Sequence, residues 1–173
     1  MKTSAKSPNA FLAIFWCGLL CGVFDITQAF TAWGIMGIPP VRILRHIASG
    51  LLGPKAYHGG TGTAALGLLL HFVIAFGAAT VYYIASRSIS FMTEHAVISG
   101  LLYGECVFLF MNFVVVPLSR APKGHFTLAT LITGPLGHTV LVGLPIALSV
   151  RRFAPASLSS PAMTSSGAAG GRA

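Results

Sequence analysis

The stretch that decides the fold is Gly18-Leu19-Leu20-Cys21-Gly22-Val23-Phe24-Asp25, near the middle of the first long apolar run. Two glycines spaced four apart lie on one face of a helix and let a neighbouring helix approach closely. An acidic residue follows on the same face, where protein can shelter it from lipid. The pattern returns at Gly100-Leu101-Leu102-Tyr103-Gly104-Glu105, so we expect two helices built for close packing.

Composition places these helices in a membrane. Of 173 residues, 54% are hydrophobic and only 8% are charged, and the mean hydropathy is +0.80. A soluble domain carries about a quarter charged residues, so the long apolar runs predict transmembrane helices. The net charge of +8 does not indicate a nucleic-acid partner, because the basic residues stand at the ends of apolar runs, where they meet water and anionic headgroups. The three cysteines form no CxxC pair, and no disulfide framework is expected.

We predict an all-α integral membrane bundle of four transmembrane helices, at about residues 10–35, 63–85, 94–116 and 126–150. A polar tail over residues 1–9 precedes the transmembrane domain 10–152, and a tail over 153–173 is expected to be disordered because it is poor in large apolar residues. The first run also admits a signal-peptide interpretation. Its motif recurs deep in the chain, however, and this favours a helix.

A short amphipathic helix is predicted at residues 41–52, between the first two spans. Pro40 suits the first helical position and Gly53 a helix end. About twelve residues are too few to cross a bilayer, so this helix lies in the interface or folds back into the bundle. Its polar sector holds Arg42, Arg45, His46 and Ser49. We expect the first three to contact lipid headgroups, and we expect residues 54–63 to form a loop in which Thr61 or Thr63 caps the second span.

The spans show an internal repeat. Helices one and three share Gly-Leu-Leu-x-Gly, and helices two and four share Gly-x-x-x-His, at Gly67/His71 and Gly134/His138. Two helix pairs related by a pseudo-twofold axis along the membrane normal are expected. The alternative is chance similarity between helices rich in leucine and glycine.

Polar side chains inside the spans are the candidate functional residues. A helix places Asp25 on the glycine face of the first span, and His71 and His138 on small-residue faces of the second and fourth. The helix-four face continues through Val142, Pro145 and Ser149. A contact of Asp25 with His71 or His138 is expected, since each would otherwise be buried alone. The full candidate set is Asp25, Gln28, His71, Glu105, Asn112 and His138.

Helix three carries a second stripe, away from its glycine face. It runs through Glu94, Glu105, Phe108 and Asn112. This stripe could face the bundle, a cavity or a second protomer, so the expected partners are the lipid bilayer and a second copy of the chain.

Two functions remain open from the residues alone. In the first, the polar groups are interhelical hydrogen bonds of about 0.6 kcal/mol each, and the protein is a structural or interaction component of the membrane. In the second, Asp, Glu and His form a proton or cation relay in a small transporter or channel subunit. The chain has no Ser-His-Asp order, HExxH, Walker or Rossmann motif, so we expect neither an enzyme nor a bound cofactor or metal.

The chain resembles a family of uncharacterised, small bacterial four-helix inner-membrane proteins, and is loosely similar to YagU-like proteins. The residues that carry this resemblance are Ile38-Pro39-Pro40-Val41-Arg42, the segment 47–53, Leu70-His71-Phe72 and the segment 142–147. The resemblance implies a multi-pass protein of the bacterial inner membrane and no activity. Six basic residues lie on the side of the termini and five on the other, a near-even division on which we expect cytoplasmic termini.

Overall fold

The computed structural model describes residues 10–123 and 128–153, with residues 128–132 described by their backbone alone. The described part is all-helical, and four of its helices are long and apolar enough to cross a membrane. The first is α1 (Ala10–Ile35) and the second is α3 (Thr61–Ser88). The third comprises α5 (Ala96–Phe110), η2 (Met111–Val115) and α6 (Val116–Leu118), and the fourth α7 (Leu128–Gly137), η3 (His138–Gly143) and α8 (Leu144–Phe153). The predicted four-span bundle is confirmed.

The repeated glycines are the points where helices meet. A Cβ on Gly18 would overlap the ring of Phe76 on α3, and a Cβ on Gly22 would overlap the ring of Phe72. The helices α1 and α3 therefore cross at van der Waals contact. On the third span, a Cβ on Gly104 would lie 2.7 Å from the Cα of Thr139 in η3. Each glycine pair therefore packs its helix against the next span, as small residues do where lipid cannot drive association.

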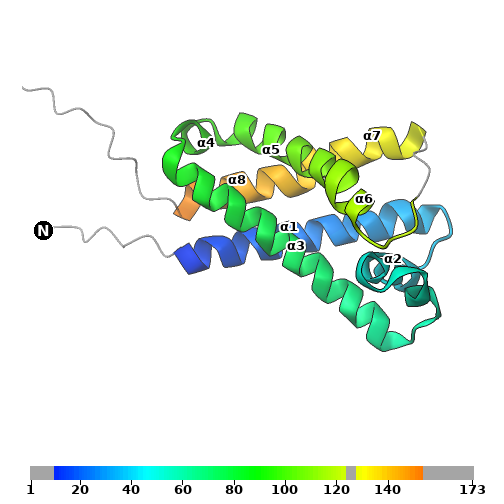
Figure 1. The fold of residues 1–173 in the computed structure, drawn as a ribbon. Coiled ribbons are helices and arrows are strands. Elements are labelled where there is room, and N and C mark those ends of the chain that lie inside the picture. The colour runs from blue at the N-terminus through cyan, green and yellow to red at the C-terminus, as the bar shows by residue number, and fades with distance from the viewer. Residues whose placement is uncertain (1–9, 124–127, 154–173) are drawn as a thin grey trace, which may run out of the picture.

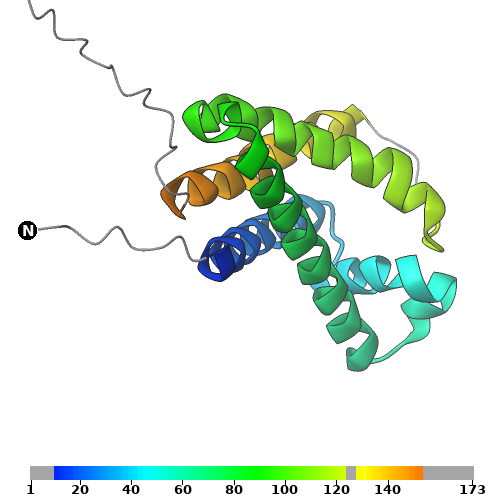
Figure 2. The same cartoon turned by 60° about the vertical axis from the view of Figure 1, so that its left-hand side comes forward.

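The two helix pairs join through α1 and α8, and they remain further apart on the side of α3 and α5 (Figures 1 and 2). The core of the join fills the bundle toward the start of α1 and the end of α8, around Cys17, Tyr82, Ile146 and Val150. The buried Tyr82 hydroxyl pairs with Ser99 Oγ at 2.8 Å and donates to Met92 O at 2.9 Å. Tyr103 on the third span donates to Ala78 O on α3 at 2.7 Å, so two tyrosine hydroxyls join the third span to α3.

The amphipathic helix is α2 (Pro40–Leu52), at the opposite end of the bundle from the end of α8 (Figure 1). Glycines with positive φ stand at both sides of it, Gly37 at 78° and Gly53 at 69°. It folds back onto the start of α3. There the carbonyl of Leu44 lies so close to Gly67 that a Cβ at this position would clash with it. Of the two predicted placements, α2 therefore takes the one packed against the bundle.

Several local predictions are wrong. The expected loop after α2 begins as a 3₁₀ helix, η1 (Gly53–His58), and Gly60 precedes α3 with no side-chain cap. Ser49, placed in the polar sector of α2, is fully buried. Its hydroxyl donates to His46 O at 2.6 Å, and this hydrogen bond makes the burial tolerable. Glu94 is exposed in a separate short helix, α4 (Phe91–Glu94), and does not extend the helix-three stripe.

The predicted face of helix four holds only as far as Val142. Beyond it the buried positions include Ile146, Ala147 and Val150, whereas the predicted Pro145 and Ser149 are only partly buried. The reason is η3, a π-helical segment, because a π turn takes one residue more than an α turn. Phe153, assigned to the tail, is the last residue of α8. The rest of both predicted tails and the start of helix four at 126–127 lie outside the described residues.

Candidate functional site

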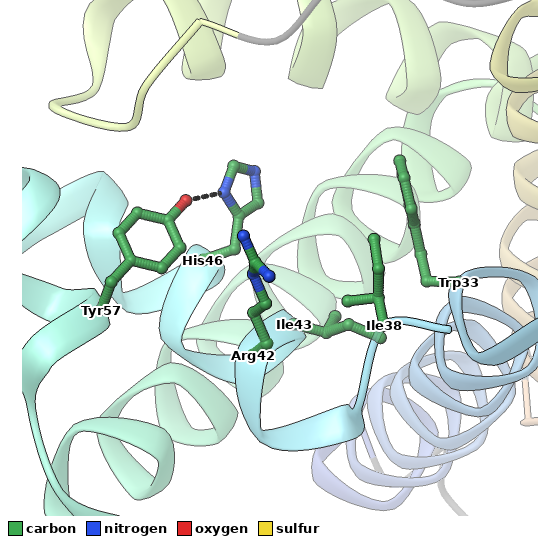
Figure 3. Close-up of a pocket in the computed structure, with 6 residues that line it drawn as sticks. All are labelled: Trp33, Ile38, Arg42, Ile43, His46 and Tyr57. Carbon is green, nitrogen blue, oxygen red and sulfur yellow. Dashed lines mark hydrogen bonds between the residues drawn. The ribbon is translucent and has the colours of Figure 1, made fainter. Parts of the chain in front are cut away.

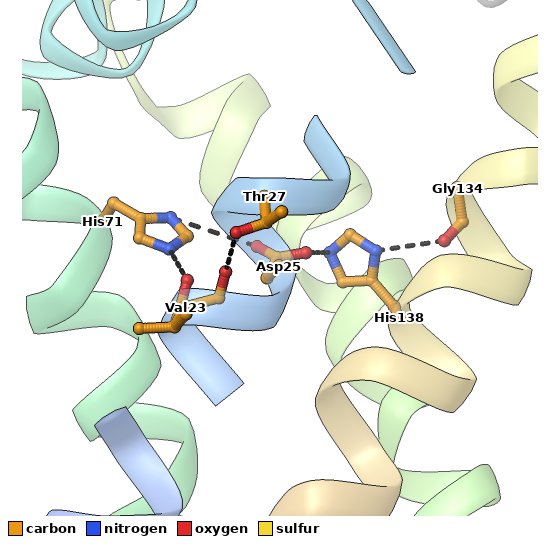
Figure 4. A network of polar contacts seen from close by, with 7 residues as sticks. Val23, Asp25, Thr27, His71, Gly134 and His138 are labelled. Atoms are coloured by element: carbon orange, nitrogen blue, oxygen red, sulfur yellow. Dashed lines mark hydrogen bonds and ion pairs between the residues drawn. The ribbon is translucent and has the colours of Figure 1, made fainter. Parts of the chain in front are cut away.

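Three segments, α1, α3 and η3, each contribute one candidate ionisable side chain to a single site in the bundle. The carboxylate of Asp25 lies between two imidazoles, 4.0 Å from Nδ1 of His71 on α3 and 3.9 Å from Nε2 of His138 on η3 (Figure 4). The sequence predicted a contact with one or the other histidine, and the structure has both. These distances suit ion pairs and are too long for direct hydrogen bonds.

The other nitrogen of each imidazole fixes the protonation pattern. His71 Nε2 lies 2.9 Å from Gly22 O on α1, and His138 Nδ1 lies 3.0 Å from Gly134 O one turn earlier in its own span. A carbonyl only accepts, so both of these nitrogens carry a hydrogen. In the neutral state each histidine therefore points a lone pair at Asp25. One added proton converts either ring into a cation facing the carboxylate, and the pair is then neutral overall.

This triad of Asp25, His71 and His138 lines a cavity of about 240 Å³. The apolar part of the wall comes mainly from Ile26, Ile43, Ile74, Ala75, Val107, Met111 and Val142. The triad side chains are one-tenth to one-quarter exposed. At 1.5 Å per residue, each triad residue lies about 4–5 Å from the middle of its helix, always toward α2. The site is therefore deep in the bundle and displaced to one side.

The remaining candidates lie outside this cavity. Glu105 accepts a hydrogen bond from Thr139 Oγ1 at 3.4 Å, and Asn112 donates to Phe108 O at 2.9 Å within its own span. Gln28 packs against Gly137. The sequence predicts a relay of Asp25, His71, Glu105 and His138. The structure brings together three of these residues and leaves Glu105 apart.

The sequence predicts that Arg42, Arg45 and His46 contact lipid headgroups, and this contact stays a prediction. In the structure, Arg42 and His46 line a second pocket of about 320 Å³ with Trp33 and Tyr57 (Figure 3). Arg45 reaches the carbonyl of Tyr57 at 3.4 Å. The polar sector of α2 is thus largely turned toward pockets of the protein itself.

The spacing of His46 predicts a headgroup contact and does not predict its place in the wall of the triad cavity. His46 lines both pockets, and its Nδ1 lies 2.6 Å from the hydroxyl of Tyr57. Although the ring is exposed to the pocket, the protein atoms around it disfavour the charged form and lower the pKa of His46. A polar residue on an amphipathic helix faces either water or a protein pocket, and its spacing alone does not distinguish them.

Two π-helical segments flank the cavity. Met111 begins η2 and His138 begins η3, and both side chains reach the cavity wall. π turns occur frequently at functional sites. In the part of the chain that the structure describes, no group of three or more His, Cys, Asp or Glu residues is arranged to hold a metal ion; the two imidazoles approach Asp25 from opposite sides (Figure 4).

In comparisons with protein-family models, curated proteins and solved structures, nothing matches this chain. The family resemblance therefore stays a prediction.

Proposed function

We propose that this protein is a small proton-coupled membrane transport protein in which Asp25, His71 and His138 form the proton-binding site. The observation that supports this most directly is the pairing pattern: each imidazole has committed one nitrogen to a carbonyl and turns the other toward the same carboxylate. Ionisable groups are costly in a bilayer, and where they occur together they commonly mark ion and proton pathways.

The site changes its charge by one unit when it takes a proton. Without the proton, Asp25 carries a negative charge that no hydrogen bond of the two rings compensates. With the proton, the imidazolium and the carboxylate form a neutral pair, which a low-dielectric interior tolerates better than a lone charge. Because either ring can hold the proton, the triad can receive a proton on the side of one histidine and release it on the side of the other.

The test is proton movement in vesicles that contain the purified protein and a pH-sensitive dye, with a pH gradient across the membrane. We expect Asp25→Asn and His71→Gln to lose the protein-dependent movement while circular dichroism shows an unchanged helix content. Glu105→Gln is the matched control, because Glu105 lies in a span but outside the cavity, and we expect it to retain the activity. Wild-type activity no higher than in empty vesicles, or full activity in Asp25→Asn, would refute the proposal.

A structural role is the second candidate, and one contact favours it. His71 Nε2 donates across the helix boundary to Gly22 O, and such interhelical bonds stabilise bundles by about 0.6 kcal/mol. If Asp25→Asn and His71→Gln lower only the unfolding midpoint in detergent and leave proton movement intact, the triad serves to hold α1, α3 and η3 together, and the protein is a structural or interaction component of its membrane.

A further inference from the structure

The triad offers hydrogen-bond acceptors and lacks donors. With both rings neutral, Asp25, His71 Nδ1 and His138 Nε2 present only lone pairs to the cavity, since the ring N–H groups are committed to Gly22 O and Gly134 O. The neighbouring Thr27 hydroxyl donates to Val23 O at 2.7 Å (Figure 4). A ligand that complements this end of the cavity must therefore bring donors, and it must bring a positive charge to neutralise Asp25.

The cavity continues sideways into an apolar groove of about 520 Å³ between α3 and α5. Cavity and groove share four residues, Ile74, Ala78, Val107 and Met111. The groove walls are almost entirely apolar, and Val81 and Phe110 along them are about 60% exposed. Both helices are membrane-span candidates, so this groove opens toward lipid acyl chains.

The pocket beside α2 has the opposite character. Arg42 faces it together with Trp33 and Tyr57 (Figure 3), so an anionic head would be held there, away from the carboxylate. Besides the triad, the residues that line the cavity include Cys21 on α1, His46 on α2, and Val107 and Met111 on the third span. Of these only Cys21 and His46 can ionise, and the burial of His46 lowers its pKa.

From this arrangement we propose that the cavity binds the ammonium head of a lipophilic amine, which enters from the bilayer through the α3–α5 groove and leaves its hydrocarbon tail there. The inference rests on the proposed proton-binding function of the same triad. A proton and an ammonium group both neutralise Asp25, so each excludes the other, and a bound lipophilic amine blocks proton movement through the site. One positive charge replaces the other there, with no covalent step.

The test is binding of short alkyl probes to the purified protein in detergent. Trp16→Phe leaves Trp33 as the only tryptophan, and Trp33 lines the cavity, so its emission reports occupancy. We expect hexylammonium to bind at least about tenfold more tightly than hexyltrimethylammonium, which has the charge but no N–H donors, because each hydrogen bond to a charged group contributes about 1.5–3 kcal/mol. Hexanoate should not displace hexylammonium, because its carboxylate fits the separate pocket of Arg42, and hexylammonium should bind more weakly at about pH 5.5 than at about pH 7.5.

Two variants and one control distinguish binding of the ammonium head from binding of the hydrocarbon tail. Asp25→Asn should abolish hexylammonium binding, and Glu105→Gln should leave it unchanged. Gly77 lies in the groove with nothing within 4 Å of an added Cβ, so Gly77→Leu should fill the groove without disturbing the fold and reduce the affinity for hexylammonium to that for methylammonium.

Equal binding of the three hexyl probes, or hexylammonium binding that Asp25→Asn leaves intact, would overturn the inference. If the wild-type protein moves protons in vesicles but does not bind hexylammonium, the amine inference fails and the proposed proton site stands. If it does neither, both fail together.

Discussion

The contact of Gly104 with η3 gives the most direct check on the geometry of the site, since it seats the segment that begins with His138. In Gly104→Ala the new methyl would lie 2.7 Å from Thr139 Cα and 2.8 Å from the carbonyl carbon of His138. Overpacking costs about 1–3 kcal/mol, and backbone atoms of a packed helix cannot turn aside as a side chain can. Alanine favours a helix interior over glycine by about 1 kcal/mol, so we expect a net destabilisation of up to about 2 kcal/mol.

Gly77→Ala is the matched control, since this glycine lies inside α3 with nothing within 4 Å of an added Cβ. It gains the same helix propensity without a clash, so we expect it to be as stable as the wild type or up to about 1 kcal/mol more stable. The two variants should therefore differ by the overpacking cost, about 1–3 kcal/mol, in the free energy of unfolding, measured by sodium dodecyl sulfate titration of the protein in mild detergent and followed by circular dichroism. Equal stabilities would refute the close contact between α5 and η3.

Further predictions concern other described groups. Tyr82→Phe removes a fully buried hydroxyl bonded to Ser99 and to a backbone carbonyl, and we expect it to lower the free energy of unfolding by about 1–2 kcal/mol in the same titration, whereas an unchanged midpoint would contradict the buried network. His46 has a lowered pKa in the fold, so the unfolded state binds its proton more readily and stability is lost as the pH falls below the ordinary histidine range of about 6.5. Wild type should consequently lose more stability on acidification than His46→Gln, and parallel pH profiles would speak against this. Of the three cysteines, Cys106 is exposed and the other two are buried, so one thiol per chain should react with a lipid-soluble maleimide, and Cys106→Ala should prevent the labelling.

The sequence was sufficient to predict the spans and the meeting of Asp25 with histidine. Both follow from short-range rules: apolar length defines a span, and a helical repeat places an acid beside glycines spaced four apart. The bounds of α1 agree with the expected 10–35 because one uninterrupted helix obeys one repeat throughout.

The fourth span shows where such rules fail. A single π segment moves the buried face from Pro145 and Ser149 to Ile146 and Val150, and a helical wheel drawn with one repeat cannot contain that step. Nor does the periodicity of α2 reveal that His46 faces a cavity, because the wall opposite it comes from spans far along the chain. Packing between segments far apart in the sequence decides both the buried face of the fourth span and the orientation of His46. The local sequence pattern therefore does not predict them.

The displacement of the triad toward α2 has an electrical consequence. A site about 4–5 Å from the centre of a hydrocarbon layer about 30 Å thick lies about a third of the way in from the α2 face. In a uniform field, a proton arriving from that face crosses about a third of the membrane voltage, or about 0.8 kcal/mol per 100 mV, whereas one arriving from the opposite face crosses twice as much. If the triad binds protons as proposed, its occupancy should respond unequally to polarisation of the two sides, and the bilayer voltage would bias the direction of proton movement.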